Sequence, residues 1–216
     1  MNKPLLISCS GLSRSGKNTF CDLVQKELEK RFKFHCCPLS FATTLRVDTQ
    51  DFLEKCGFDV WKDVNKELFR PVLIWYASLK RTQTKGQYFI ERLKRDFEIK
   101  AGGGYFNAFL ISDLRFAEYS PNDEIDFCKQ NGVVVHISRY KLALRTESEE
   151  SNNLIKHFDL PPNEFEAKND PLIKERADYR LEWKNENGRV ENLSSHITHF
   201  IDWLEQNYLS KNNHLP

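Results

Sequence analysis

The sequence predicts an α/β protein in which a mostly parallel β-sheet carries helices on both faces, giving three layers. Two patterns and the chain length support this. Apolar runs of strand length alternate with segments whose apolar residues recur at helical spacing. The first apolar run, residues 4–10, leads through a glycine loop directly into a helical pattern. At 216 residues, the chain is long enough for one such domain with a small inserted lid.

The elements follow one another in a regular order. Strands are predicted at short apolar runs bounded by turn residues: 4–10, 32–37, 106–113, 133–138 and 179–183. Helices are predicted where apolar residues recur every three or four positions: from Lys17, and over 42–56, 63–81, 87–99, 124–131 and 193–208. Pro71 should kink its helix or mark a new helix start. Residues 140–175 are polar, acidic and weakly periodic, which predicts a mobile lid or an excursion on the surface.

Composition excludes several classes of protein. The chain is 40% apolar and 29% charged with a net charge of +1, so we expect no nucleic-acid partner and no membrane partner. Its six cysteines show no metal spacing and predict reduced thiols. No apolar run approaches membrane-spanning length, and the N-terminus lacks a signal-peptide pattern. We therefore expect a cytoplasmic protein.

The glycine loop has the spacing of a phosphate-binding loop, Gly11-x-x-x-x-Gly16-Lys17. Its backbone N–H groups can wrap a polyphosphate, the following helix presents its positive end, and the lysine reaches the outer phosphates. The strand before the loop and the helix after it are the context that such a loop requires. The residues expected to bind ATP here are Gly11, Ser13, Ser15, Gly16, Lys17, Asn18 and Thr19.

Asn18 occupies the position where such loops usually carry a serine or threonine that ligates magnesium. An amide oxygen can ligate Mg²⁺ or hold a metal-bound water, although less well than a hydroxyl or carboxylate. Thr19 lies one position too late to replace it. We still expect a need for Mg²⁺, because the cation neutralises the phosphate charge.

The segment FLISDLRF, residues 109–116, provides a second signal. Asp113 lies at the carboxyl end of a predicted strand, where open parallel sheets bind their ligands. It could hold Mg²⁺ or bind a substrate hydroxyl, and Arg115 would reach into the same crevice. The alternative is an aspartate that caps the next turn beside a solvated arginine.

Further arginines could bind an anionic acceptor, because guanidinium groups pair well with phosphate. Arg70 has apolar neighbours, and Arg46, Lys80 and Arg81 could join it; the alternative for each is a solvated helix charge. In the lid region, Arg139 and Arg145 could stabilise the charge on a transferring phosphoryl group.

At this point the residues resemble a known group of enzymes. GLSRSGKNT resembles the phosphate loop of phage-type deoxynucleoside monophosphate kinases and of animal-type phosphomevalonate kinase, which place an acidic residue after the lysine. Asn18 would be the amide counterpart of that residue. FLISDLRF, NKELFRPVLIWYASLKR and GVVVHISR resemble later segments of the same family, in the same order. The resemblance extends from Leu5 to Tyr208.

The resemblance implies one P-loop NTPase domain over residues 1–216, with an acceptor-binding region at about 40–100 and a lid at about 140–175. It implies that Lys17 and Arg14 serve the ATP phosphates. It also assigns the acceptor and the reacting centre to Arg70, Asp113 and Arg115, and it carries over Arg145 of the lid as a catalytic arginine. Arg46 is a further candidate for acceptor binding, on its own charge.

The activity expected from the sequence is ATP-dependent, Mg²⁺-requiring transfer of a phosphoryl group to a small phosphorylated acceptor. A (deoxy)nucleoside monophosphate is the first choice of acceptor, and an aromatic slot built from Trp75, Tyr76 or Phe116 would favour it. Core packing explains these three residues equally well. Phosphomevalonate is the alternative acceptor. A nucleotide-binding module without transfer activity also remains open because of Asn18. We expect a monomer or a homodimer.

Overall fold

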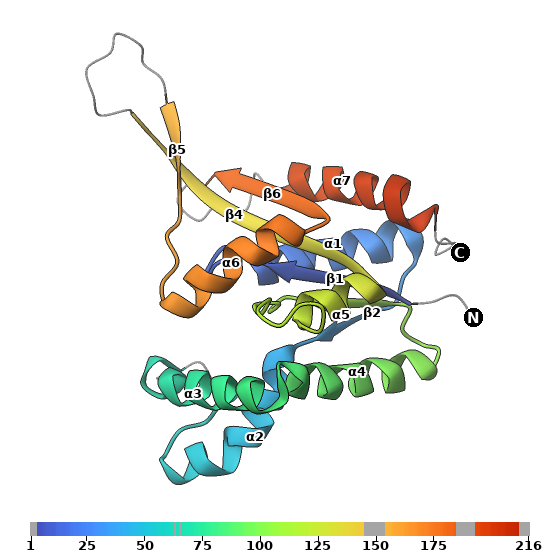
Figure 1. Ribbon diagram of the computed structural model, residues 1–216. Helices are drawn as coiled ribbons and strands as arrows, with labels where there is room; N and C mark the ends of the chain where they lie inside the picture. The colour runs from blue at the N-terminus through green and yellow to red at the C-terminus, as the bar shows by residue number, and fades with distance from the viewer. Residues whose placement is uncertain (1–3, 63, 65, 145–153, 185–192, 212–216) are drawn as a thin grey trace.

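The computed structural model describes residues 4–62, 64, 66–144, 154–184 and 193–211 (Figure 1). Its strands are β1 (Leu5–Ser10), β2 (Cys36–Leu39), β3 (Ala108–Ile111), β4 (Gly132–Leu144), β5 (Leu154–Phe158) and β6 (Tyr179–Lys184). Its helices are α1 (Lys17–Phe32), α2 (Phe41–Lys55), α3 (Lys66–Thr84), α4 (Gln87–Gly102), α5 (Glu124–Asn131), α6 (Glu164–Arg176) and α7 (Leu193–Leu204). The predicted α/β class is confirmed.

The sheet is parallel except for β5. Its order is β2-β3-β1-β4, and β6 pairs in parallel with β4. The register places Leu5 opposite Ala108 of β3, and Leu6 opposite Gly132 of β4. Because β1 and β3 are parallel neighbours, the loops that follow their carboxyl ends meet at one edge of the sheet. One of these loops is the glycine loop from Gly11 to Lys17, called the phosphate loop below after its spacing. The other is the segment from Asp113 to Arg115.

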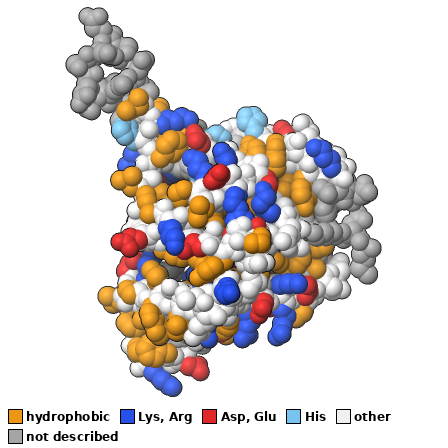
Figure 2. Space-filling model, viewed as in Figure 1, with side chains coloured by type: hydrophobic (Ala, Val, Ile, Leu, Met, Phe, Trp, Pro, Cys, Tyr) orange, Lys and Arg blue, Asp and Glu red, His pale blue; other side chains and the backbone are white. Residues whose placement is uncertain are grey.

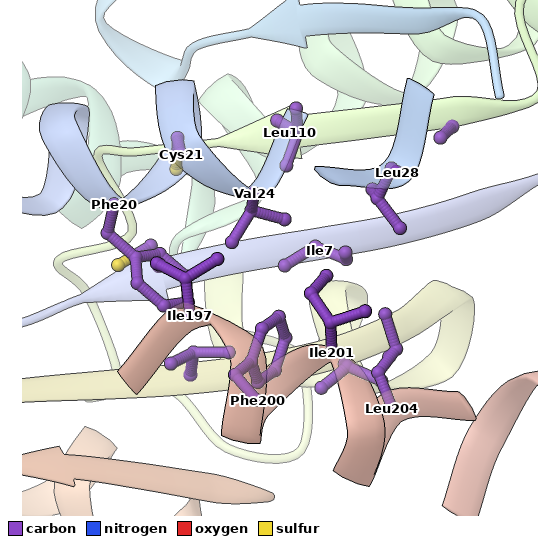
Figure 3. Close-up of a cluster of buried hydrophobic side chains, with 14 of the residues drawn as sticks. Ile7, Phe20, Cys21, Val24, Leu28, Leu110, Ile197, Phe200, Ile201 and Leu204 are labelled. Carbon is purple, nitrogen blue, oxygen red and sulfur yellow. The ribbon is translucent and has the colours of Figure 1, made fainter. Parts of the chain in front are cut away.

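Helices cover both faces of the sheet, as the sequence predicts. In Figure 3, Phe20 of α1 and Phe200 of α7 lie against Ile7 of β1 on one face. On the other face, apolar side chains of α4 and α5 pack against β3, with Phe97 and Phe109 in edge-to-face contact at 4.8 Å between ring centroids. The sheet and the helices on its two faces form three layers (Figure 1). Strand β1, which leads into the phosphate loop, contributes side chains to the core on both faces.

Helices α2 and α3 form an arm on the α4 side of the sheet (Figure 1). The arm has a small core of its own, made of Leu53, Val60, Phe69 and Leu73. Pro71 lies inside α3, which continues through it. Large apolar side chains are exposed on the arm, and Figure 2 shows apolar groups gathered there: Val47, Phe52, Trp61, Val64, Leu68, Ile74, Trp75 and Leu79.

The described part of the segment predicted as a lid contains regular secondary structure. The end of β4 pairs with β5 in an antiparallel extension that leads away from the body of the molecule, and α6 follows (Figure 1). Only Ile173 is a buried apolar residue of α6; its other buried residues are Glu166 and Asn169. A helix anchored mainly by polar side chains has little apolar periodicity, which explains why the sequence pattern missed it. Arg145 and the acidic run that follows it lie outside the described residues.

Some element boundaries differ from the predictions. The second strand begins at Cys36, because α1 continues through Phe32. The final helix ends at Leu204 and is followed by a short π-helical segment, Glu205–Leu209. Among the described residues, no helix combines the length and the apolar character needed to cross a bilayer.

Candidate functional site

The phosphate loop connects β1 to α1 and has two positions that only glycine can occupy. Gly11 has φ of 134°, and a Cβ atom there would lie 2.3 Å from the carbonyl oxygen of Ile137. Gly16 has φ of 94°, and a Cβ atom there would lie 2.1 Å from the ring of Trp183. Side chains avoid both the conformation and the crowding. The loop is therefore held in shape by close contact with β4 and β6.

Lys17 is the first residue of α1 and is only 6% exposed. Its Nζ atom donates to the carbonyl oxygens of Gly11 at 2.8 Å and Leu12 at 2.7 Å. An ammonium group has three N–H donors, so one is left for a ligand. Burial, with a smaller contribution from the nearby charge of Arg115, lowers the pKa of Lys17 to about 8. The charges of Glu166 and Asp170 act in the opposite direction.

The other loop residues surround the N-terminus of α1. Arg14 is exposed and has φ of 64°, a backbone conformation uncommon for a residue with a side chain. Ser15 is 1% exposed, and its Oγ atom has no hydrogen-bond partner among the described residues. Asn18 and Thr19 lie in the first turn of α1, where Asn18 is exposed. The positive end of a helix favours an anion, so a cation near the exposed Asn18 amide would need phosphate beside it.

Asp113 follows β3 and caps the N-terminus of α2. Its Oδ2 atom accepts hydrogen bonds from Ser40 Oγ at 2.7 Å and from the N–H of Ala42 at 2.8 Å. Its Oδ1 atom accepts one from the N–H of Phe41 at 3.1 Å. The capping role that the sequence left open is thus visible, although the capped helix is α2 and not the turn that follows. A carboxylate has about four lone-pair positions, so one on Oδ1 is left for a metal ion or a metal-bound water.

Arg115 lies two residues beyond Asp113 and reaches the phosphate loop through an acidic residue. Its Nη1 atom donates to Glu166 Oε1 at 2.7 Å. The other oxygen, Glu166 Oε2, accepts the backbone N–H of Ser13 at 2.6 Å. The Arg115 side chain is 36% exposed, whereas the Glu166 side chain is 7% exposed. A buried carboxylate therefore connects the phosphate loop with the arginine that follows the neighbouring strand.

Two of the predicted acceptor arginines, Arg46 and Arg70, lie on the arm. Arg46 of α2 stacks over the ring of Trp61, with 5.8 Å between guanidinium carbon and ring centroid. Arg70 of α3 pairs with Glu67 at 2.9 Å, and its Nε atom is buried with no hydrogen-bond partner among the described residues. A buried donor without a partner costs free energy, so Arg70 fits a site for an anion.

Arg81 of α3 is the most enclosed of these cations. Its Nη2 atom pairs with Glu124 Oε1 at 2.7 Å, and its guanidinium carbon lies 4.7 Å from the ring centroid of Phe116 and 5.6 Å from that of Phe165. Glu124 is fully buried, and burial raises its pKa. Its Oε2 atom accepts the backbone N–H of Arg115 at 3.3 Å. This ion pair therefore joins the arm to the Asp113–Arg115 loop, in addition to the hydrogen bonds from the start of α2 to Asp113.

The structure also brings residues to the site that the sequence patterns did not identify. Besides Glu166 and Glu124, the buried His136 pairs through Nε2 with Oδ1 of the half-buried Asp170 at 3.1 Å. These two residues line a cavity of about 90 Å³ together with Ser15 of the phosphate loop. Glu166 and Asp170 are four residues apart in α6, a spacing that places both on one face of a helix. This spacing was the signal in the sequence that could have identified the two residues. It does not indicate a site, however, unless the position of α6 in the fold is known.

Lys17, Asp113 and Arg115 are therefore brought to one edge of the sheet, at the ends of β1 and β3. Arg46 and Arg70 lie on the arm, and Arg145 is outside the described residues. Arg139 of β4 pairs with Asp159. This arrangement provides a phosphate loop, a second cationic group next to it, and an arm with further arginines.

Comparisons with known proteins add little to this geometry. No family model matches the sequence, and no curated protein matches it. Among solved structures, the chain is similar to shikimate kinase from Bacteroides thetaiotaomicron, with a TM-score of 0.44 and 14% sequence identity. The similarity covers 93% of this chain and 98% of that chain.

Proposed function

We propose that the chain is an ATP-dependent phosphotransferase that acts on a small phosphorylated acceptor, in the first place a (deoxy)nucleoside monophosphate. The observation that carries this proposal is the placement of two cations from adjacent parallel strands. Lys17 follows β1 and Arg115 follows β3, and they lie close enough for the charge of Arg115 to lower the pKa of Lys17. Two cations at one phosphate loop suit a centre where phosphoryl groups of a donor and an acceptor meet.

The donor would be held by the phosphate loop. The backbone N–H groups between Gly11 and Gly16 and the positive end of α1 would bind the ATP phosphates, with Lys17 on the outer ones. Arg14, exposed at the loop, is available for the same phosphates. When bound, Mg²⁺ would neutralise phosphate charge. Asn18 and the remaining position on Asp113 Oδ1 are the groups proposed to hold it, directly or through water.

The chain would then contribute mainly position and charge. An acceptor phosphate oxygen would attack the γ-phosphorus of ATP in line, the bond to the leaving ADP oxygen would break, and no covalent enzyme intermediate would form. Arg115 would hold the acceptor phosphate against the transferring group, because a guanidinium pairs with two oxygens at once. Asp113 fixes the N-terminus of α2, which begins the acceptor region, next to this centre.

The arm would supply acceptor recognition. The unpartnered Nε atom of Arg70 supports an anion site there, and Arg46 lies on the neighbouring helix. Of the three aromatic candidates for a base-binding slot, Phe116 stacks on Phe165, with 6.0 Å between ring centroids. Trp75 is 64% exposed and is free to contact a base. A nucleotide acceptor is favoured on this ground, and phosphomevalonate is the alternative phosphomonoester.

The test is a coupled assay of ADP release with ATP and Mg²⁺ against a panel of ribo- and deoxyribonucleoside monophosphates and phosphomevalonate. We expect turnover with at least one nucleoside monophosphate, and its loss in the Lys17→Ala variant. Turnover with phosphomevalonate alone would replace the acceptor but keep the reaction. Measurable ATP binding with no turnover for any acceptor would instead support a nucleotide-binding module, the function that Asn18 leaves open.

A further inference from the structure

Glu166 is an acidic residue in the middle of the proposed phosphate site. Glu166 is 6% exposed, and both of its carboxylate oxygens are used: one by the N–H of Ser13 and the other by Nη1 of Arg115. A negative charge there opposes the binding of phosphate. It must therefore be offset by something that the carboxylate does for the site.

We propose that Glu166 is a positioning residue that holds the Arg115 guanidinium beside the phosphate loop. The inference rests on the proposed phosphoryl transfer and deepens it. The carboxylate joins the donor-binding loop to the acceptor-binding arginine, so that both meet the same phosphoryl group in a fixed geometry.

The carboxylate itself is held by a packed helix and not by a loop. The backbone N–H of Glu166 donates to the side chain of Asn163, the N-cap of α6, at 2.9 Å. One turn later, Asn169 accepts the N–H of Ala117 at 2.9 Å and is 1% exposed. On the same helix, the ring of Phe165 stacks on Phe116 at an interplanar angle of 10°. Helix α6 therefore contacts both the side chain of Arg115 and the loop directly after Arg115.

The arrangement uses the backbone N–H of Ser13 but leaves N–H donors of both cations available for phosphate. A guanidinium carries five N–H donors, of which Glu166 takes one from Arg115. Lys17 gives two of its three protons to loop carbonyls and keeps one. The carboxylate charge also acts on two cations that repel each other: it pairs with Arg115, whose charge lowers the pKa of Lys17, and it raises that pKa itself. Glu166 thus allows both cations to remain close together.

The test compares Glu166→Gln and Glu166→Ala with Glu164→Gln. Glu164 is an exposed acidic residue in the same first turn of α6, so its variant controls for the change in charge near the helix N-terminus. With the best acceptor of the panel, we expect the Glu166 variants to lower kcat by about 10- to 100-fold, because misplacing a positioned group by about 1 Å has effects of this size. The KM for ATP should change by less than about threefold. The Glu164 variant should match the parent protein.

A double-mutant cycle separates positioning from a general structural role. If Glu166 acts through Arg115, the loss of kcat in Glu166→Gln combined with Arg115→Gln should equal the loss in Arg115→Gln alone. Additive losses would overturn the proposal. So would an unchanged kcat in Glu166→Gln. Tighter ATP binding with undiminished kcat would also overturn it, because Glu166 would then only occupy the place of a phosphate.

A second measurement does not depend on turnover. Hydrogen exchange of the Ser13 amide, followed by NMR in the ligand-free protein, should accelerate in Glu166→Ala, which removes the acceptor of that N–H, and not in Glu164→Gln. Unchanged exchange at Ser13 would remove the contact on which the inference stands. If the parent protein turns over no acceptor, the proposed function fails. If the parent is active and the Glu166 variants match it, the inference alone fails.

Discussion

Raising the pH from about 7 to about 9 should remove the positive charge of Lys17 in the phosphate loop, because the pKa of Lys17 is lowered to about 8. With that pKa, about nine in ten Lys17 side chains carry a proton at about pH 7, and about one in ten at about pH 9. If the ammonium binds ATP phosphates and the neutral amine does not, affinity should fall by about tenfold, or about 1.4 kcal/mol.

Isothermal titration calorimetry with a non-hydrolysable ATP analogue and Mg²⁺ measures this directly across the same pH range. The parent protein should show the rise in Kd. Lys17→Met should bind weakly at every pH, because it has no group to titrate at this position. A Kd for the parent protein that stays within about twofold from pH 7 to pH 9 would refute the reasoning, since either the amine would not touch phosphate or its pKa would not be lowered.

The same group makes folding stability depend on pH in the ligand-free protein. The pKa of Lys17 is 10.5 when exposed and about 8 when folded, so between these values the unfolded chain binds more protons. Stability should therefore rise with pH over this window, by about 3 kcal/mol at 1.36 kcal/mol per pH unit. Urea unfolding of the parent protein and of Lys17→Met isolates this contribution, because other titrating groups are common to both. The free energy of unfolding of the parent should rise relative to that of the variant as pH increases from about 8 to about 10. A constant difference between the two free energies would contradict the lowered pKa of Lys17.

Three further variants test the frame around the site. Gly16→Ala should lower the free energy of unfolding by about 2 kcal/mol or more, because its Cβ would meet the Trp183 ring at a positive φ; thermal unfolding measures the loss. Asp113→Asn should cost about 1–2 kcal/mol in urea unfolding, because an amide cannot accept all three hydrogen bonds at the start of α2. Arg81→Met removes the cation that lowers the pKa of buried Glu124, so that pKa rises further above its unfolded value. The variant should therefore lose more stability at about pH 8 than at about pH 5, and equal losses at both would contradict the burial argument.

The phosphate loop and the sheet could be predicted because their signals are local. The spacing of Gly11, Gly16 and Lys17 requires only a few consecutive residues, and apolar periodicity marks the strands and helices that carry the core. The prediction of Asp113 at a strand end was also local. The hydrogen-bond partners of Asp113 could not be predicted in this way, because Asp113 caps a helix that begins 72 residues earlier.

The contacts that complete the site could not be predicted, since they join distant parts of the chain. Glu166 lies 153 residues from Ser13. It belongs to a helix without a clear apolar stripe, so neither the helix nor its position over the sheet followed from the pattern. Trp183 is similar: its strand was predicted, but its contact with Gly16 depends on where β6 pairs with β4. Pattern thus identifies what can bind phosphate, and packing determines which charges surround it.

Transfer of a labelled phosphoryl group tests the central claim most directly. The protein is incubated with Mg²⁺, ATP labelled at the γ-phosphate and each acceptor of the panel, and the products are separated by chromatography. The account predicts that label appears on one phosphorylated acceptor, converting a monophosphate to the diphosphate, and that Lys17→Met transfers none. ATP binding by the parent protein without label on any acceptor would contradict it.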